Sequence, residues 1–391
     1  MEKKIHWNID SDNSRGIYIH IPFCRQACRY CDFYFTVSLR YMDRFVECVV
    51  KEIGERKLEI RGDQRVTSIY LGGGTPSLMQ PGDLDRIMDR VFADYPVKEN
   101  AEITIECNPD DLTAESLRFY RKRGFNRLSI GVQSFHNRDL ELLRRSHDSQ
   151  QAIRSILEAA SEGFDNLNVD LMYGIPGQTE KQWRDNLERL RGLPIQHLSA
   201  YHLSFEPGTV FDHWRKKGLL VPVHDQLSES LFGILRDTMD QEGFDHYEIS
   251  NFASDKKHSR HNLVYWTGAP YQGFGPSAHS YNGEVRSWNV ASLKKYIESI
   301  TGGIPVSENE RLSSTEAYHD YLITSLRTRR GADPGWILEQ FGESTGTHFS
   351  RTTERLLSDG IMETWQGRMI IPPEKWLVTD LILRELFLDT I

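Results

Sequence analysis

Tyr18-Ile-His-Ile-Pro-Phe-Cys-Arg-Gln-Ala-Cys-Arg-Tyr-Cys-Asp-Phe33 is the stretch of this 391-residue sequence on which the fold prediction depends. Residues 18–21 form a run typical of a buried strand. Pro22 ends that strand because proline has no backbone N–H to donate to a sheet. Tyr18 and His20 occupy alternate positions, so both side chains can point to one face. The cysteines that follow therefore begin a loop at the carboxyl end of a strand, where α/β barrels build their sites.

The loop carries three of the five cysteines, spaced Cys24-x3-Cys28-x2-Cys31. Three thiolates from one loop suit an iron-sulfur cube, and a four-iron cluster with three protein ligands keeps one iron open for a bidentate small molecule. A structural zinc site would need a fourth local Cys or His. The remaining candidates for a fourth ligand are His20, Cys48 and Cys107, and none of them lies at the short sequence spacing that zinc loops use. Three buried thiols without a ligand are the alternative, and the polar neighbours in the loop argue against it.

The composition is that of an ordinary soluble globular protein, with 39% hydrophobic and 26% charged residues. Forty-seven Lys and Arg against 56 Asp and Glu give a net charge of −9, which argues against a broad nucleic-acid interface. No apolar run reaches the roughly 18 residues of a transmembrane helix, and the first residues lack the apolar segment of a signal peptide. The cysteines do not form a secreted disulfide framework, so Cys48 and Cys107 are expected to be core thiols. We expect a cytoplasmic protein.

Strand-like and helix-like segments alternate six times in the first half of the chain. The expected strands are residues 16–21, 66–71, 101–106, 127–132, 166–171 and 197–203. The expected helices are residues 39–57, 83–95, 113–123, 149–162 and 180–192, the third of them capped by Thr113. Such alternation predicts parallel strands in an open or closed α/β barrel.

The alternation stops after residue 206. A helix is expected at 225–242, an irregular segment at 243–289 and another helix from Ser292. Further helices at 314–327, 334–341 and 349–359, with a small wing at 367–372, resemble a winged-helix module, which we expect to be structural because the chain is acidic. The predicted organisation is an N-terminal arm (1–15), a barrel core (16–206), a barrel-associated extension (207–309) and a winged-helix-like domain (310–391).

Cys-x3-Cys-x2-Cys after a strand is identified as the motif of the radical S-adenosylmethionine (SAM) superfamily. The stretch from Tyr18 to Phe33 resembles the branch that contains oxygen-independent coproporphyrinogen III oxidase (HemN) and the HemW heme chaperones. This resemblance extends over nearly the whole chain. It implies an α/β fold with a partial (β/α)6 TIM-like barrel and a winged-helix-like helical domain at the C-terminus. It also implies a [4Fe-4S] cluster on Cys24, Cys28 and Cys31, with SAM on the open iron.

The resemblance further implies a set of SAM contacts. The glycine triplet 72–74 follows the second strand and matches the motif that receives the SAM amino group, although by itself it is equally a tight turn. The implied contacts are Tyr18, His20, Tyr30, Gly73, Gly74, Thr75, Glu106, Gln133, Arg145, Asp170 and Ser204. A guanidinium suits the SAM carboxylate, whereas amide and acid groups suit its hydroxyls. Without the family, Arg145 beside Arg144 would be interpreted as a solvated pair of charges.

Two features favour the chaperone over the oxidase. The oxidase carries a fourth cysteine where this chain has Phe33, and only 23 residues precede Cys24, fewer than in the oxidase. His261-Asn-Leu-Val-Tyr-Trp266 resembles the heme-associated motif of HemW, in which His261 would be an axial ligand while Tyr265 and Trp266 pack on the porphyrin. The alternative is an aromatic segment packed against the barrel. The next motif departs from the family at Gln272 and Ser277, which replace a leucine and a glycine.

We therefore expect a heme chaperone that binds a [4Fe-4S] cluster, SAM and heme and transfers heme to acceptor hemoproteins. Expected partners are heme, these acceptors and heme donors, with no nucleic acid, and no catalytic residue is assigned. The alternatives are an oxygen-independent coproporphyrinogen III oxidase and a radical enzyme for an unrelated substrate. Productive SAM cleavage, covalent attachment of heme, peripheral membrane association and homodimerisation stay open at the level of sequence.

Overall fold

The computed structural model describes residues 14–57 and 65–388, so most of the predicted N-terminal arm lies outside the described residues. Six strands are parallel neighbours in chain order. They are β1 (Ser14–Ile21), β2 (Arg65–Gly73), β3 (Val97–Cys107), β4 (Arg127–Gln133), β5 (Leu167–Tyr173) and β6 (His197–His202). The predicted parallel α/β core is confirmed, with β1 beginning two residues before the predicted start.

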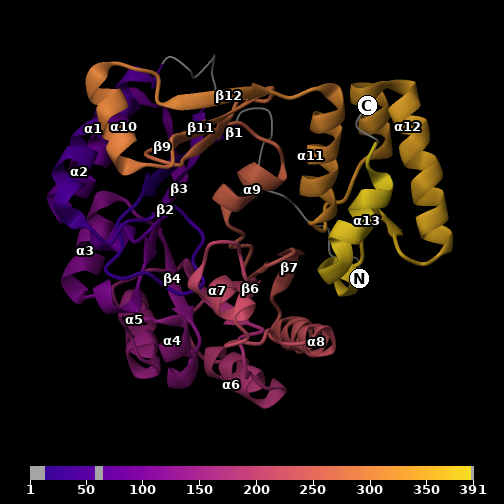
Figure 1. The fold of residues 1–391 in the computed structure, drawn as a ribbon, viewed down its shortest axis with the longest axis horizontal. Helices are drawn as coiled ribbons and strands as arrows, with labels where there is room; N and C mark the ends of the chain where they lie inside the picture. Colours follow the sequence, from indigo (N-terminus) through magenta and orange to yellow (C-terminus); the bar gives the residue numbers. More distant parts are fainter. Residues whose placement is uncertain (1–13, 58–64, 389–391) are drawn as a thin grey trace.

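Helices cover the outer side of this sheet (Figure 1). They are α1 (Met42–Glu55), α2 (Pro81–Asp94), α3 (Ala114–Arg123), α5 (Ser149–Ser161), α6 (Glu180–Leu190) and α8 (Asp225–Gln241). Two short helices, α4 (Asn137–Leu143) and α7 (Val210–Lys216), instead contact the cysteine loop, where the Arg29 N–H donates to the Leu143 carbonyl (3.3 Å) and the Phe211 N–H donates to the Arg29 carbonyl (3.1 Å). Short 3-10 turns add η2 (Leu39–Tyr41), η4 (Pro76–Leu78) and η5 (Pro109–Asp111). Thr113 caps α3 as predicted, in a capping box with Ser116. The sequence did not predict α4 and α7, because two turns are too short for a clear helical period.

Alternate residues along the parallel strands face opposite sides of the sheet. Those that pack against the outer helices are apolar, such as Ile69 and Leu71 in β2. The residues between them are polar or glycine, namely Tyr18, His20, Ser68, Tyr70, Gly72, Glu102, Thr104, Glu106, Arg127, Ser129, Gly131, Asn168, Asp170, His197 and Ser199. The barrel interior is therefore lined by hydrogen-bonding groups instead of the branched apolar residues that fill a closed TIM barrel.

The sheet continues beyond the six strands and stays open. Its order is β12-β11-β10-β9-β1-β2-β3-β4-β5-β6-β8-β7, and the two outermost strands, β12 and β7, do not pair with each other. The added strands are β7 (Asp245–Glu248), β8 (Asn251–Ala253), β9 (Tyr271–Phe274), β10 (His279–Tyr281), β11 (Val285–Asn289) and β12 (Ser307–Arg311). The predicted irregular segment at 243–289 is thus wrong. Strands of three to five residues show too little alternation to be recognised from sequence.

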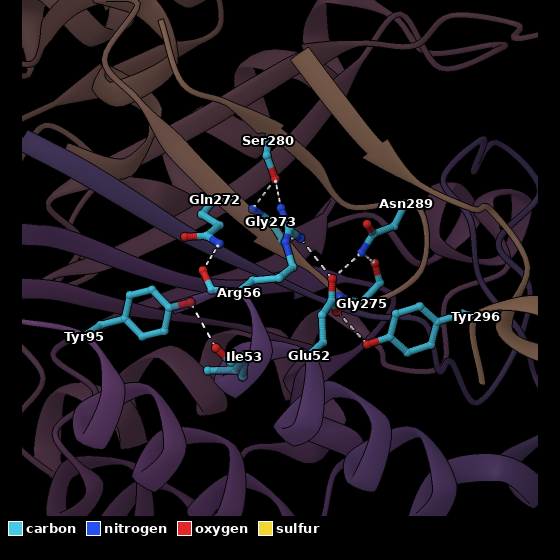
Figure 2. A network of polar contacts seen from close by, with 10 residues as sticks. All are labelled: Glu52, Ile53, Arg56, Tyr95, Gln272, Gly273, Gly275, Ser280, Asn289 and Tyr296. Carbon is cyan, nitrogen blue, oxygen red and sulfur yellow. Dashed lines mark hydrogen bonds and ion pairs between the residues drawn. The ribbon is translucent and has the colours of Figure 1, made fainter. Parts of the chain in front are cut away.

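A buried carboxylate fastens this extension to the barrel (Figure 2). Glu52 on α1 is 1% exposed and accepts hydrogen bonds from the Arg56 guanidinium (3.0 Å) and the Gly275 N–H (2.9 Å). Asn289 Nδ2 (2.7 Å) and the Tyr296 hydroxyl (2.6 Å) also donate to it. Tyr296 belongs to α10 (Leu293–Gly302). Four donors compensate the burial of the charge, so Glu52 ties α1 to the segments around β9, β11 and α10.

The C-terminal domain is helical and carries one hairpin, as predicted. It contains α11 (Ser314–Leu326), α12 (Pro334–Ser358), β13 (Glu363–Trp365), β14 (Arg368–Ile370), η6 (Pro373–Val378) and α13 (Thr379–Leu386). Gly342 interrupts α12 with φ +83°, which matches the predicted division into two helices, although the second begins before residue 349. The sequence did not predict α13. None of the helices in the described ranges combines the length and apolar character needed to span a bilayer.

Candidate functional site

The cysteine loop leaves the carboxyl end of β1 and is closed at its base by backbone hydrogen bonds. The Cys24 N–H donates to the Thr36 carbonyl (3.0 Å), and the Thr36 N–H donates to the Pro22 carbonyl (2.7 Å). Phe23 is fully buried beneath this closure. The three cysteines are half-buried free thiols. The loop is therefore anchored at both ends while its thiols face outward from the core.

All three thiols line one cavity of about 450 Å³ inside the barrel. Nine of the eleven predicted SAM contacts line the same cavity, and they are Tyr30, Gly73, Gly74, Thr75, Glu106, Gln133, Arg145, Asp170 and Ser204. They come from the cysteine loop and from the ends of β2 to β6 and the loops that follow them. Residues separated by up to 180 positions thus converge, because the carboxyl ends of parallel strands meet at one edge of a sheet.

The glycine triplet allows β2 to pass close to β1. Gly73 has φ +106°, and a Cβ there would lie 2.4 Å from the His20 ring. A Cβ on Gly74 would lie 2.7 Å from the carbonyl oxygens of Ile21 and Phe23. The Gly74 N–H donates to Ile21 (2.8 Å), and the Thr75 N–H donates to Phe23 (2.7 Å). Side chains are excluded here by the neighbouring strand and loop, so the triplet is more than an ordinary tight turn.

Two carboxylates face the middle of the cavity. Glu106 accepts hydrogen bonds from the Tyr70 hydroxyl (2.7 Å) and the Gly73 N–H (3.0 Å). Burial raises the pKa of Glu106 to about 7 despite these donors. Asp170 accepts from Asn168 Nδ2 (2.7 Å), and burial also raises its pKa. Both acids lie where a polar ligand would exchange hydrogen bonds with them.

Arg145 crosses the cavity wall toward the cysteine loop. Its guanidinium donates to Asn108 Oδ1 (2.5 Å), to the Gly131 carbonyl (2.8 Å) and to Cys28 Sγ (3.5 Å). The interpretation of Arg144 and Arg145 as a solvated pair is therefore wrong, since only Arg144 is exposed. Arg145 places a positive charge beside the thiols.

Gln133 is directed into the cavity by an irregular backbone. Its φ is +69°, which is uncommon for a residue other than glycine. The pairing register of β4 with β5 shifts between Gly131 and Gln133. Such an irregularity at a strand end re-aims a side chain, and strained backbone of this kind gathers at functional sites.

Tyr18 and His20 lie side by side behind the cavity wall and do not line it. The Tyr18 hydroxyl is 3.1 Å from His20 Nδ1, and His20 Nε2 is 2.8 Å from the Tyr34 carbonyl oxygen. The prediction that both point to one face is confirmed. In this structure they support the glycine triplet and the cysteine loop, and their role as direct SAM contacts stays a prediction.

The predicted heme residues lie elsewhere, on α9 (Arg260–Trp266), near the amino ends of the strands. His261 is 1% exposed; its Nδ1 is 3.0 Å from Ser68 Oγ and its Nε2 is 2.9 Å from the Tyr265 hydroxyl. The Glu102 carboxylate accepts from the His261 N–H (3.1 Å), and burial lowers the pKa of the imidazole to about 3. Trp266 is half-buried. Both ring nitrogens of His261 are thus already engaged, one with Ser68 of β2 and the other with Tyr265 of α9 itself.

Several cavity residues were missed by the sequence reasoning. They include Tyr70, Asn108, Arg127, Ser129, Asn168, Ser199, Tyr201 and Asn262. Most occupy polar positions between apolar neighbours in the parallel strands. That period-two pattern was the available signal, since a parallel strand covered on both faces is otherwise apolar throughout.

An open parallel barrel with a three-cysteine loop at the carboxyl ends of its strands defines a protein of the radical SAM class. The model of the radical SAM superfamily matches residues 18–190. The chain is 34% identical to the heme chaperone HemW of Bacillus subtilis (strain 168), covering 91% of this chain and 97% of that protein. It is 30% identical to the mitochondrial radical S-adenosyl methionine domain-containing protein 1 of Danio rerio, covering 95% and 88%.

Among solved structures, coproporphyrinogen III oxidase (HemN) from Escherichia coli matches with a TM-score of 0.83 and 23% identity over 96% of this chain and 91% of that chain. This likeness establishes the fold of both the barrel and the C-terminal domain. The sequence relatives establish more. The chain belongs to the HemW family of radical SAM proteins.

Proposed function

We propose that this chain is a heme chaperone that binds a [4Fe-4S] cluster, SAM and heme and transfers heme to acceptor hemoproteins. The observation that carries the proposal is the convergence of three free thiols and nine predicted SAM contacts on one cavity. The name heme chaperone, given to relatives that match over most of their length, supports the heme function. Heme donors and acceptors are the expected partners.

The donor set fits a cluster held by Cys24, Cys28 and Cys31. Burial raises the pKa of the Cys24 and Cys31 thiols, that of Cys31 to about 12, so these thiols ionise at neutral pH only beside added positive charge. A metal cluster supplies such charge, and Arg145 adds its own within 3.5 Å of Cys28 Sγ. When bound and reduced, a cluster with one open iron supplies an electron to the sulfonium of SAM.

The cavity residues have distinct tasks toward SAM. Arg145 would pair with the SAM carboxylate, because a guanidinium offers parallel donors to a planar acid. Glu106 and Asp170 would accept hydrogen bonds from the ribose hydroxyls, at the cost of rearranging the contacts with Tyr70 and Asn168. The carbonyl groups of the glycine triplet would accept from the amino group, since its N–H groups at Gly73 and Gly74 are already engaged.

The heme site requires a local rearrangement in this proposal. His261 can ligate iron only after Nε2 releases the Tyr265 hydroxyl, and α9 then has to shift relative to β2. Tyr265 and Trp266 would offer their rings to the porphyrin faces. At the cavity mouth, Phe33 is 68% exposed where an oxidase would present a further thiol.

The deciding experiment uses anaerobically reconstituted protein in two parallel incubations. One is titrated with hemin; the other receives reductant, SAM and coproporphyrinogen III. Stoichiometric heme binding, followed by transfer to an apo-hemoprotein and without protoporphyrinogen formation, is expected. Catalytic formation of protoporphyrinogen with no stable heme complex would overturn the proposal and make the chain an oxidase.

A further inference from the structure

A buried arginine without a partner lies in the cavity wall. Arg127 is the first residue of β4, is 2% exposed and lines the cavity. Its Nε is buried without a hydrogen-bond partner. Within residues 14–57 and 65–388, no side chain or backbone group forms a hydrogen bond or ion pair with its guanidinium. An arginine keeps its positive charge in proteins, and an uncompensated buried charge is costly, so this group calls for an anion.

The immediate surroundings of Arg127 are neutral and polar. Ser129, Asn168, Ser199 and Asn262 are uncharged polar residues that line the cavity together with Arg127. Asn168 is itself saturated, because its Nδ2 donates to Ser129 Oγ (2.8 Å) and to Asp170, and its Oδ1 lies 2.6 Å from His197 Nδ1. The Ser129 and Ser199 hydroxyls donate into the same network, so these uncharged groups bring no negative charge to the guanidinium.

The two cavity carboxylates do not neutralise Arg127 by contact. Neither Glu106 nor Asp170 lies within ion-pair distance of it, and both already accept hydrogen bonds from other residues. Its charge acts on them through space, opposing the rise that burial causes in the pKa of each acid. A singly charged ligand would neutralise the guanidinium. A doubly charged phosphate would keep a net negative charge, which the carboxylates of Glu106 and Asp170 would repel.

Arg127 lies at a different depth from the SAM residues. Gly131, whose carbonyl accepts from Arg145, is four residues further along β4. At the rise of a strand, the two backbone positions are separated by roughly 13 Å. The cysteines and Arg145 are at the carboxyl end of the strands, while Arg127 is the first residue at the amino end of β4, and its charge acts on His261 of α9.

We propose that Arg127 binds the carboxylate of a second small molecule, held deeper in the barrel than SAM. The identity of the upper ligand rests on the proposed function, but the anion site rests on Arg127 alone. A planar monoanion matches the fork of a guanidinium with two parallel hydrogen bonds, and the hydroxyl and amide groups nearby complete its surroundings. The ligand class is therefore a monocarboxylate small enough to enter the barrel beside SAM.

The test measures binding of radiolabelled propionate and of radiolabelled SAM by equilibrium dialysis on the same cluster-reconstituted protein. Wild type is expected to bind propionate at one site, and Arg127→Gln to weaken it at least tenfold while changing SAM affinity by less. Arg127→Lys, which keeps the charge but loses the fork, should fall between them. Arg118→Gln is the matched control, because Arg118 is an exposed arginine of α3 paired with Glu162.

A measurement on wild type covers the case in which the variants fail to fold. Propionate, but not chloride at equal ionic strength, should protect Arg127 from modification by phenylglyoxal, as mapped by peptide mass spectrometry. Absence of propionate binding to wild type, unchanged binding in folded Arg127→Gln, or unprotected Arg127 would each overturn the proposal. Loss of SAM binding by wild type would instead count against the proposed function, so the two failures are distinguishable.

Discussion

Glu106 sits at the centre of the cavity wall, and its burial places its ionisation near neutral pH. Its pKa is raised from 4.5 to about 7. Between pH 4.5 and about 7, the folded protein therefore keeps a proton on Glu106 that the unfolded chain has lost. Linkage then requires the free energy of unfolding to fall as pH rises through this window, by roughly 3 kcal/mol at most. In Glu106→Gln we expect the thermal midpoint to depend less on pH between 5 and 8 than in wild type.

Glu248 provides the matched control. Burial raises its pKa to about 7 as well, but it does not line the cavity. Glu248→Gln should flatten the same pH dependence and leave SAM affinity unchanged, whereas Glu106→Gln should change both. A wild-type pH profile in folded Glu106→Gln would show that this carboxyl group does not titrate in the expected range.

The cysteine ligands can be tested against a cysteine of the core. Cys28→Ala should abolish the cluster absorbance after anaerobic reconstitution, because only two of the three predicted thiolate ligands would remain. Cys48→Ala is the control, since Cys48 is buried on α1 and its Sγ lies 4.0 Å from Thr301 Oγ1. Full iron content in purified Cys28→Ala would contradict the assignment.

At the scale of elements, His261 anchors α9 to the barrel through a hydrogen bond of its ring. One of the ring nitrogens would have to give up its partner to bind heme iron. If His261 ligates heme iron, Tyr265→Phe removes the hydroxyl that occupies Nε2 and should tighten hemin binding, while His261→Ala should weaken it at least tenfold. Both variants also lose a contact inside the barrel. A purely structural histidine would lower thermal stability in both variants and leave hemin affinity unchanged in each, as a hemin titration would reveal.

The attachment of the extension can be tested at Tyr296 of α10. Tyr296→Phe removes one of the four donors to the buried Glu52 carboxylate, which should cost about 1–3 kcal/mol of unfolding free energy and lower the thermal midpoint by several degrees. Tyr281→Phe is the control, because its hydrogen bond to the Gly283 carbonyl is exposed. Equal midpoints for the two variants would show that the Glu52 contacts do not hold α10.

At the scale of the whole molecule, regular features were predictable and irregular ones were not. The six βα units follow from long, periodic segments, and the cysteine spacing identified the loop. The strands of the extension are too short to show a period, and whether the barrel closes depends on pairing with β9 and β8, which no local pattern encodes. The burial of His261 depends on Ser68 and Glu102, residues far away in sequence. Arg127 was missed because one charged residue in a strand is individually uninformative.

The separation of the predicted sites leads to a prediction about the whole chain. Ser68, which contacts His261, lies five residues before Gly73 on β2, so the heme residues and the glycine triplet are roughly 16 Å apart along that strand. The two sets meet through stacked rings, because His261 packs on Tyr70 with ring centroids 5.0 Å apart, and Tyr70 lines the SAM cavity and donates to Glu106. A packing contact that stays in place when either ligand binds transmits little coupling free energy, and any coupling must be reciprocal. Saturating SAM should therefore change the hemin Kd less than twofold, and Cys28→Ala should bind hemin as wild type does. A tenfold change in either titration, matched by an equal effect of heme on SAM affinity, would mean that α9 and the cysteine loop move together.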